Sequence, residues 1–288
     1  MKNEKYLITG ATGFLGSCLA RQLIAQKKHV SVIVRNRKLN WRLNDISNNL
    51  YIYECDIQDS KLQDIVNAIK PDYIFHFAAY GPLPHESNIN QMIDVNIKGT
   101  LNLINATKKN KFKLFVNTGS SAEYGIKSHS MKETDILEPI NDYGVTKVAT
   151  TLLCQKEAIR CNLPIITLRL FSPYGYFEEQ SRLIPWIVLH VLHNSPITLS
   201  SPNNVRDFIF IEDVVDAYIK ATHVVCKPGE IFNIGNGIQY SVSDIVRVVQ
   251  QITKSEIRPL WGKVEGLSRQ IEPKLWQADI SKSKNVLH

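Results

Sequence analysis

A tyrosine and a lysine four positions apart, preceded by a serine, form the pattern with the clearest chemical meaning in this sequence. Tyr143 and Lys147 are spaced i and i+4, so on a helix they lie on one face. An ammonium group beside a phenol favours the phenolate and lowers the tyrosine pKa from about 10. Such a tyrosine can exchange a proton with a carbinol oxygen while hydride moves at the carbon, and the Ser120 hydroxyl can hydrogen-bond the same oxygen. We therefore predict that Ser120, Tyr143 and Lys147 are catalytic.

Hydride chemistry of this kind needs a dinucleotide, and the start of the chain carries a glycine-rich turn that suits one. The turn lies between a strand-like run at 5–9 and an apolar-periodic segment at 14–26, with glycines spaced G-x-x-G-x-x-G. Glycine lets the backbone turn tightly and approach a pyrophosphate, whose charge then faces the helix N-terminus. The cofactor-binding residues predicted at this turn are Gly10, Thr12, Gly13, Phe14, Leu15 and Gly16.

The end of the second predicted strand bears on which dinucleotide is bound. An acid at this point would hydrogen-bond a ribose 2′-hydroxyl, whereas arginine accommodates a 2′-phosphate. The sequence has Arg35 and Arg37 there and no acid, which favours NADP(H) and leaves NAD(H) possible. The alternative is that both are solvated loop charges. Asp56 and Ile57 follow the third strand, where a carboxylate can meet the adenine. Phe77, Ala78 and Ala79 end the fourth strand, and their backbone can approach the cofactor closely; both segments could also be plain loop sequence.

Strand-like and helix-like segments alternate through the first part of the chain. This predicts an α/β fold, a Rossmann-like doubly wound parallel sheet covered on both faces. We expect the NAD(P)-binding domain to span 1–170 and a smaller, mainly substrate-binding part, interleaved with the sheet, to span 171–288. Predicted strands are 5–9, 29–35, 50–54, 72–77, 113–117 and 164–169; predicted helices are 14–26, 60–69, 89–109 and 142–161. Short elements at 208–211, 213–224 and 242–253 follow.

The composition of the chain limits the class of protein to which it can belong. Of the 288 residues 44% are apolar and 21% charged, which is typical of a globular protein. No apolar run reaches the ~18 residues of a membrane span, and the N-terminus leads straight into a strand, so we expect a cytoplasmic protein without a membrane anchor. Five cysteines without a CxxC pair argue against a disulfide framework or a metal site. The net charge of +7 suits an anionic ligand or simply a basic soluble protein. No nucleic-acid-binding module is recognisable.

Taken in order, these motifs resemble those of the extended short-chain dehydrogenase/reductases, in the nucleotide-sugar epimerase/dehydratase/4-ketoreductase superfamily. Thr9 to Gly16, the run from Ser120 to Gly125, and the pair Tyr143 and Lys147 carry the resemblance. It implies further cofactor contacts at Asn96, Thr118, Tyr143, Lys147, Phe171 and Pro173. It also implies a nucleotide-linked sugar as substrate, bound by Tyr80, Ser121, Ala122, Arg182, Arg206 and Arg269. The two last arginines would meet the diphosphate, unless they form surface salt bridges.

The departures from the superfamily pattern narrow the reaction. Its 4,6-dehydratases carry Asp-Glu directly after the catalytic hydroxyl residue, where this chain has Ser121 and Ala122, and neither can shuttle a proton. The cysteine of the GDP-fucose-type epimerase-reductases is absent too. The resemblance and the two arginines therefore favour an NADPH-dependent reductase of an NDP-4-keto-6-deoxyhexose. The alternatives are an NDP-hexose 4-epimerase, similar to UDP-glucose 4-epimerase, and a non-catalytic dinucleotide-sensing protein. The family also implies a homodimer, through helices 89–109 and 142–161.

Overall fold

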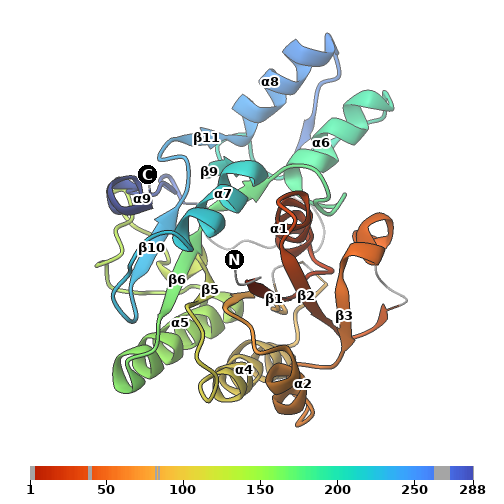
Figure 1. The fold of residues 1–288 in the computed structure, drawn as a ribbon. Coiled ribbons are helices and arrows are strands. Elements are labelled where there is room, and N and C mark those ends of the chain that lie inside the picture. Colours follow the sequence, from red (N-terminus) through yellow and green to blue (C-terminus); the bar gives the residue numbers. More distant parts are fainter. Residues whose placement is uncertain (1–3, 38–40, 82, 84, 263–272, 288) are drawn as a thin grey trace.

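A parallel sheet of seven strands, in the order β10-β6-β5-β4-β1-β2-β3, forms the centre of the computed structural model (Figure 1). The structure describes residues 4–37, 41–81, 83, 85–262 and 273–287. The strands of this sheet are β1 (Lys5–Thr9), β2 (His29–Val34), β3 (Tyr51–Glu54), β4 (Tyr73–His76), β5 (Leu114–Ser120), β6 (Ile165–Leu170) and β10 (Ile231–Ile234). Every pair of neighbours is parallel. The prediction of a doubly wound parallel sheet is confirmed.

Helices cover both faces of this sheet, because successive side chains of each strand point to opposite sides. On β1, Ile8 belongs to the apolar cluster beneath α1 (Phe14–Ala25) and α7 (Ile211–Ala221), whereas Leu7 belongs to the cluster beneath the helices of the other face. Those helices are α2 (Leu62–Ile69), α4 (Thr100–Thr107) and α5 (Asp142–Cys161), and α9 (Ser281–Leu287) packs beside β10 and α7. Two cores, one for each face, therefore hold the sheet.

The single helix predicted at 89–109 is divided in the structure. It consists of α3 (Ile89–Met92), a π-helical segment η3 (Ile93–Gly99) and α4. A π-helical turn opens the regular hydrogen-bond ladder and is found often at functional sites. Here η3 carries Asn96, whose side chain is directed to the loop after β4.

The chain after β6 builds a smaller lobe and also returns to the main sheet. A three-stranded sheet in the order β11-β9-β7 contains β7 (Ser172–Tyr174), β9 (Val205–Phe210) and β11 (Gln239–Ser241). Helices α6 (Leu183–Leu192) and α8 (Val242–Thr253) pack together over the pair β8 (Thr198–Leu199) and β12 (Leu260–Trp261), around a cluster of their own (Figure 1). Short 3₁₀ turns, η2 (Asn44–Asn49) and η4 (Ser121–Glu123), complete the description.

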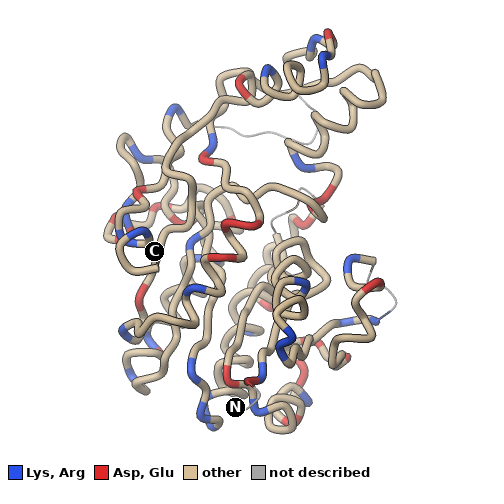
Figure 2. Tube along the Cα trace, turned by 45° about the horizontal axis from the view of Figure 1, so that its top comes forward, with Lys and Arg blue, Asp and Glu red and all other residues tan. Residues whose placement is uncertain are grey.

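Basic and acidic residues are interspersed along the chain, as Figure 2 shows. Among the described residues no helix is both long and apolar enough to cross a bilayer.

Candidate active site

A cavity of about 1050 Å³ opens at the carboxyl ends of the central strands. It lies where the strand order reverses, between β1 and β4, which is the usual ligand-binding place of an open parallel sheet. Its walls come from the loops after β1, β2, β3, β4, β5 and β6 and from the start of α5. The residues that follow each strand are therefore set by local sequence, and the parallel sheet brings them together around one cavity.

The glycine-rich turn forms the part of this cavity beside α1. Gly10 has φ +72°, and a Cβ there would lie 2.5 Å from the backbone nitrogen of Ala78. A Cβ at Gly16 would lie 2.5 Å from the carbonyl oxygen of Gly10. Any larger residue would therefore push the turn away from the sheet. Within the described part of the chain no side chain caps α1 at Gly13, so the first N–H groups of the helix stay available to an anion. The residues present fit a dinucleotide pyrophosphate.

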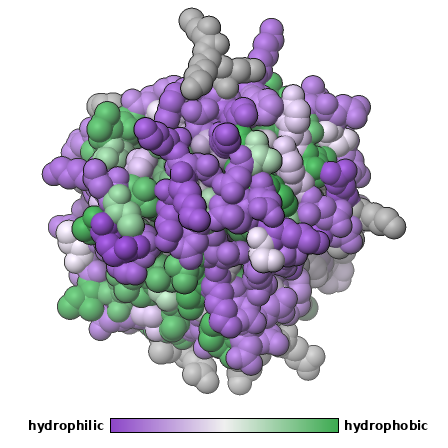
Figure 3. Space-filling model, turned by 60° about the horizontal axis from the view of Figure 1, so that its bottom comes forward, coloured by the Kyte–Doolittle hydropathy of each residue, from purple (hydrophilic) through white to green (hydrophobic). Residues whose placement is uncertain are grey.

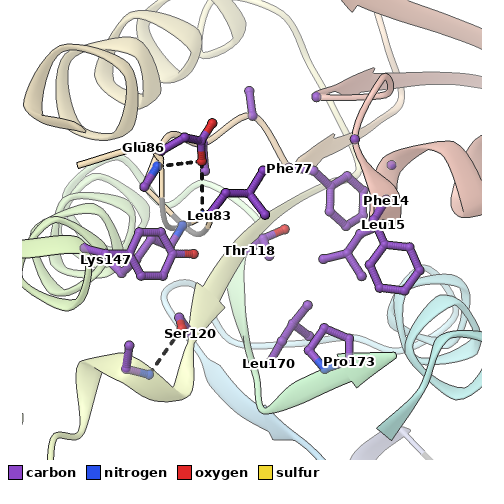
Figure 4. Close-up of a pocket in the computed structure, with 18 of the residues that line it drawn as sticks. Phe14, Leu15, Phe77, Leu83, Glu86, Thr118, Ser120, Lys147, Leu170 and Pro173 are labelled. Atoms are coloured by element: carbon purple, nitrogen blue, oxygen red, sulfur yellow. Dashed lines mark hydrogen bonds between the residues drawn. The ribbon is translucent and has the colours of Figure 1, made fainter. Parts of the chain in front are cut away.

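Ser120, Tyr143 and Lys147 all line the cavity. Figure 4 labels Ser120 and Lys147 among the side chains that line it. Ser120 ends β5, and its hydroxyl accepts a hydrogen bond from the backbone N–H of Ala122 at 3.2 Å. Tyr143 and Lys147 lie in the first two turns of α5. The helix begins there because the Asn141 side chain accepts from the N–H of Gly144 at 2.7 Å.

The expected lowering of the Tyr143 pKa by Lys147 is wrong for this structure. Burial of the phenol raises the pKa of Tyr143 to about 12, and the negative charge of Glu123 acts in the same direction. The charge of Arg182 and hydrogen bonding with Ser120 oppose the rise without outweighing it. Burial also lowers the pKa of Lys147, because desolvation disfavours its ammonium form. The sequence argument considered only the pair, whereas its surroundings decide the sign.

Most residues predicted to bind the cofactor line the same cavity. Besides the turn, they are Arg35, Asp56, Ile57, Phe77, Ala78, Ala79, Thr118, Phe171 and Pro173. The hydroxyl of Thr118 also lies 2.7 Å from that of Tyr218 on α7.

Two of the predicted cofactor residues lie outside the cavity wall. The guanidinium of Arg37 donates to the carbonyl of Ile52. The buried Asn96 side chain accepts a hydrogen bond from the backbone N–H of Tyr80 and donates one to the Tyr80 carbonyl, each at 2.8 Å. Asn96 thus holds the backbone of the loop after β4 in place.

The predicted substrate residues are only partly brought together. Ser121, Ala122, Arg182 and Arg206 line the cavity. Tyr80 instead packs against the core beneath α2 and α4, and Arg269 lies outside the described residues.

Comparison with known proteins identifies the family. A family model described as the NAD dependent epimerase/dehydratase family matches residues 6–235. The chain belongs to this family. Its relatives include an uncharacterized UDP-glucose epimerase, YtcB, of Bacillus subtilis (strain 168), which is 29% identical over 99% of this chain and 92% of that protein. The UDP-glucose 4-epimerase of Mycoplasma genitalium is 28% identical over 97% of this chain and 89% of that enzyme.

A solved structure of another protein is similar to this chain in both fold and sequence. UDP-glucuronic acid 4-epimerase from Bacillus cereus, in complex with UDP-glucuronic acid and NAD, superposes with a TM-score of 0.87 at 27% identity. The superposition covers 98% of this chain and 92% of that one. The likeness therefore spans both the sheet and the smaller lobe.

Arg42 is a cavity residue of this family member that sequence reasoning missed. Its side chain is 6% exposed and joins three segments. Nη1 donates to the carbonyl of Thr12 at 3.2 Å, Nε to that of Phe177 at 2.7 Å, and Nη2 contacts Glu179 at 2.6 Å. Arg42 thus fastens the glycine turn to the segment after β7. No motif marks it, because its partners lie up to 137 positions away.

Glu178 and Trp276 also line the cavity without having been predicted there. The Glu178 side chain is 6% exposed, and its Oε2 is buried without a hydrogen-bond partner among the residues that the structure describes. Burial raises the pKa of Glu178 to about 7, against the opposing charge of Arg182, which lies 3.5 Å away. Trp276 lies seven positions after Arg269, the nearest residue predicted to bind the substrate.

Proposed function

We propose that this chain is a nucleotide-sugar 4-epimerase that works with a bound nicotinamide dinucleotide. The observation that carries the proposal is that Ser120, Tyr143 and Lys147 line one cavity with the glycine turn. The similarity to a protein named as a UDP-glucose epimerase and to two named as 4-epimerases, over nearly the whole chain, favours this reaction over the 4-keto reduction that the sequence suggested. Arg182 and Arg206, in the same cavity, are the proposed partners of a diphosphate.

The proposed chemistry assigns one task to each catalytic side chain. A bound oxidised dinucleotide would supply the hydride acceptor and a positive charge that favours the phenolate of Tyr143. The Ser120 hydroxyl hydrogen-bonds the oxygen on C4 of the sugar. The proton of the sugar's own 4-hydroxyl would pass to Tyr143 Oη as hydride leaves C4, and it would return to the same oxygen when the hydride is restored to the opposite face of C4. Lys147 would hold the nicotinamide ribose, as the family resemblance implies.

A second candidate is the NADPH-dependent reduction of an NDP-4-keto-6-deoxyhexose. Arg35 supports it, because this exposed arginine lines the cavity at the end of β2, where no acid stands. Arg37 offers less support, since it contacts the Ile52 carbonyl. The solved relative holds NAD, which favours NAD for this chain and the epimerase. A dinucleotide-sensing protein without catalysis is the third hypothesis, and the shared cavity of the three catalytic residues speaks against it.

We also propose that the protein is a homodimer. On α5, Val145, Leu152 and Ile159 follow one another at intervals of seven and are 50%, 49% and 65% exposed. Apolar side chains repeated at this interval form a stripe suited to another helix. Figure 3 shows hydrophobic side chains at the surface among hydrophilic ones on the side towards which α2, α4 and α5 lie in Figure 1.

Incubation of the protein with UDP-glucose, UDP-galactose and a panel of NDP-4-keto-6-deoxyhexoses, with NAD or NADPH, tests the function. An epimerase interconverts the first pair without net change in the dinucleotide. A reductase consumes NADPH with a 4-keto sugar only. Tyr143→Phe should lower turnover by roughly 10²- to 10⁴-fold and leave dinucleotide binding nearly intact. Tyr51→Phe, the same change at a half-exposed surface tyrosine, serves as the control. Full activity of Tyr143→Phe would remove that residue from the mechanism.

A further inference from the structure

A buried ion pair lies directly beneath the catalytic serine. Nε of Arg169, on β6, contacts Oε2 of Glu123 at 2.8 Å. Glu123 is 0% and Arg169 1% exposed. Arg169 Nη1 also donates to the hydroxyl of Tyr124 at 3.0 Å, which in turn donates to Asn233 Oδ1 on β10 at 2.6 Å. The carboxylate of Glu123 is therefore anchored to the two strands at one edge of the sheet.

The second oxygen of the same carboxylate joins the two catalytic elements. Oε1 of Glu123 accepts from the backbone N–H of Ser120 at 2.8 Å and from the hydroxyl of Thr151 at 3.0 Å. Thr151 lies on α5 four positions after Lys147 and eight after Tyr143, so the three side chains share one face of the helix. One oxygen atom thus links the end of β5, which carries Ser120, to the helix that carries Tyr143 and Lys147.

Close packing keeps this link in a single arrangement. A Cβ at Gly119 would lie 2.8 Å from Oε1 of Glu123 and 2.9 Å from Cγ of Arg169. Only glycine lets β5 pass so close over the ion pair. The hydroxyl of Ser120 also accepts a hydrogen bond from the backbone N–H of Ala122, while the Glu123 carboxylate accepts one from the backbone N–H of Ser120. The two side chains thus form a capping box at the start of η4.

We propose that Glu123 is a positioning residue that sets the place of Ser120 relative to Tyr143 and Lys147. The inference rests on the proposed function in so far as those three residues act on one sugar oxygen. Glu123 lies behind the serine loop, outside the residues that line the cavity, and so acts through the others. Because the position of a catalytic group sets the rate rather than nucleotide affinity, its loss should lower kcat and leave KM nearly unchanged.

The charge of Glu123 gives a second, independent readout. The groups that act on Tyr143 are Glu123, Glu86, Arg182 and the hydroxyl of Ser120, with Tyr218 facing it from α7 and Lys147 on the same helix. Glu123 raises the pKa of Tyr143 and opposes the fall of the Lys147 pKa. An uncharged isostere at position 123 should therefore move the limb of the pH–rate profile that belongs to Tyr143 towards lower pH.

Thr151→Val is the main test, because it removes one hydrogen bond and leaves the ion pair and the fold in place. Thr107→Val is the matched control, since among the described residues this buried threonine donates only to carbonyls of its own helix α4. We expect kcat of Thr151→Val to fall by about ten- to a hundredfold relative to the control, with similar KM and melting temperature. An unchanged kcat would overturn the positioning role.

Glu123→Gln tests the charge, because the amide oxygen can still accept from Ser120 while the negative charge is gone. The pH–rate limb should move to lower pH in this variant and stay in place in Thr151→Val, which keeps the charge. A limb unmoved in Glu123→Gln would contradict the inference. If leaving Arg169 buried and uncompensated prevents folding, Thr151→Val alone decides.

The proposed function can fail separately from this inference. Failure of the wild-type protein to act on any sugar of the panel would refute the function alone. Crystal structures of the wild type and of Thr151→Val would then decide the positioning claim. We expect Ser120 and the start of α5 to be displaced relative to each other in the variant, and unchanged coordinates would overturn the claim.

Discussion

The indole Nε1–H of Trp276 donates to the hydroxyl of Ser121 at 3.1 Å, across 155 positions of sequence. The guanidinium of Arg206 lies over the same ring, 5.2 Å from its centre. The indole therefore connects the residue after Ser120, the proposed catalytic serine, to the arginine proposed for the diphosphate. Dehydratases of the superfamily carry an acid at the Ser121 position. In this protein the Ser121 hydroxyl instead accepts a hydrogen bond from Trp276, a residue of the cavity wall.

Removal of the indole ring should weaken nucleotide-sugar binding more than catalysis. We expect Trp276→Ala to raise KM by about three- to thirtyfold, since a cation over an aromatic face gains roughly 0.5–2 kcal/mol. Trp276→Phe keeps a ring for Arg206 and loses only the N–H, so it should match Ser121→Ala, which loses the acceptor of the same bond. Steady-state kinetics and calorimetry with UDP measure the effect. Equal KM values for all three variants and the wild type would show that the ring has no such role.

Replacement of Arg42 should loosen the dinucleotide cleft. Arg42→Met leaves the carbonyls of Thr12 and Phe177 and the carboxylate of Glu179 without this partner. Buried hydrogen bonds to a charged group contribute about 1.5–3 kcal/mol each, so we expect a loss of roughly 2 kcal/mol or more in unfolding free energy. Dinucleotide affinity should fall as well. Urea denaturation and cofactor titration measure both. Lys98→Met is the control: it breaks an exposed ion pair with Asp94 and should change the unfolding free energy by less than about 1 kcal/mol. Equal losses in Arg42→Met and Lys98→Met would contradict the role of Arg42 in joining the glycine turn to the segment after β7.

The buried carboxyl of Glu178 should make stability depend on pH. Burial raises its pKa from 4.5 to about 7 in the folded protein, so the folded state keeps a proton that the unfolded chain has released. The stabilisation of the folded state that comes from this raised pKa is fully present below pH 4.5 and is lost as the pH rises through 7. Relative to Glu178→Gln, the wild type should lose roughly 3 kcal/mol of unfolding free energy over this window.

Denaturant titrations of the ligand-free protein at several pH values measure this difference. The Glu54→Gln variant gives the control, because it makes the same substitution at an exposed surface residue. A Glu178→Gln curve parallel to that of the wild type would exclude a raised pKa at this position.

A charge in the apolar stripe of α5 should separate the proposed dimer. Leu152→Asp places a carboxylate where the proposed helix pair would exclude water, so we expect a monomer in sedimentation or light scattering with an intact fold by circular dichroism. Ile136→Asp, at a position that is 78% exposed and outside this stripe, should leave the oligomeric state unaltered. A wild-type monomer would refute the dimer itself.

The sequence by itself determined the local units. The strand, glycine turn and helix from Lys5 to Ala25 could be predicted because turn geometry and apolar periodicity act between near neighbours. Tyr143 and Lys147 share a face of α5 for the same reason. The alternation of such units also predicted the parallel sheet, although the π-helical break at η3 left no sequence signal that we could read.

Only the tertiary structure decided what surrounds these units. The contacts of Glu123 with Arg169, of Arg42 with Glu179 and of Trp276 with Ser121 span 46, 137 and 155 positions. No periodicity or spacing rule reaches so far, because such contacts depend on how whole strands and loops pack. The pKa of Tyr143 depends on the same packing, since desolvation and the charge of Glu123 act through space and not along the chain.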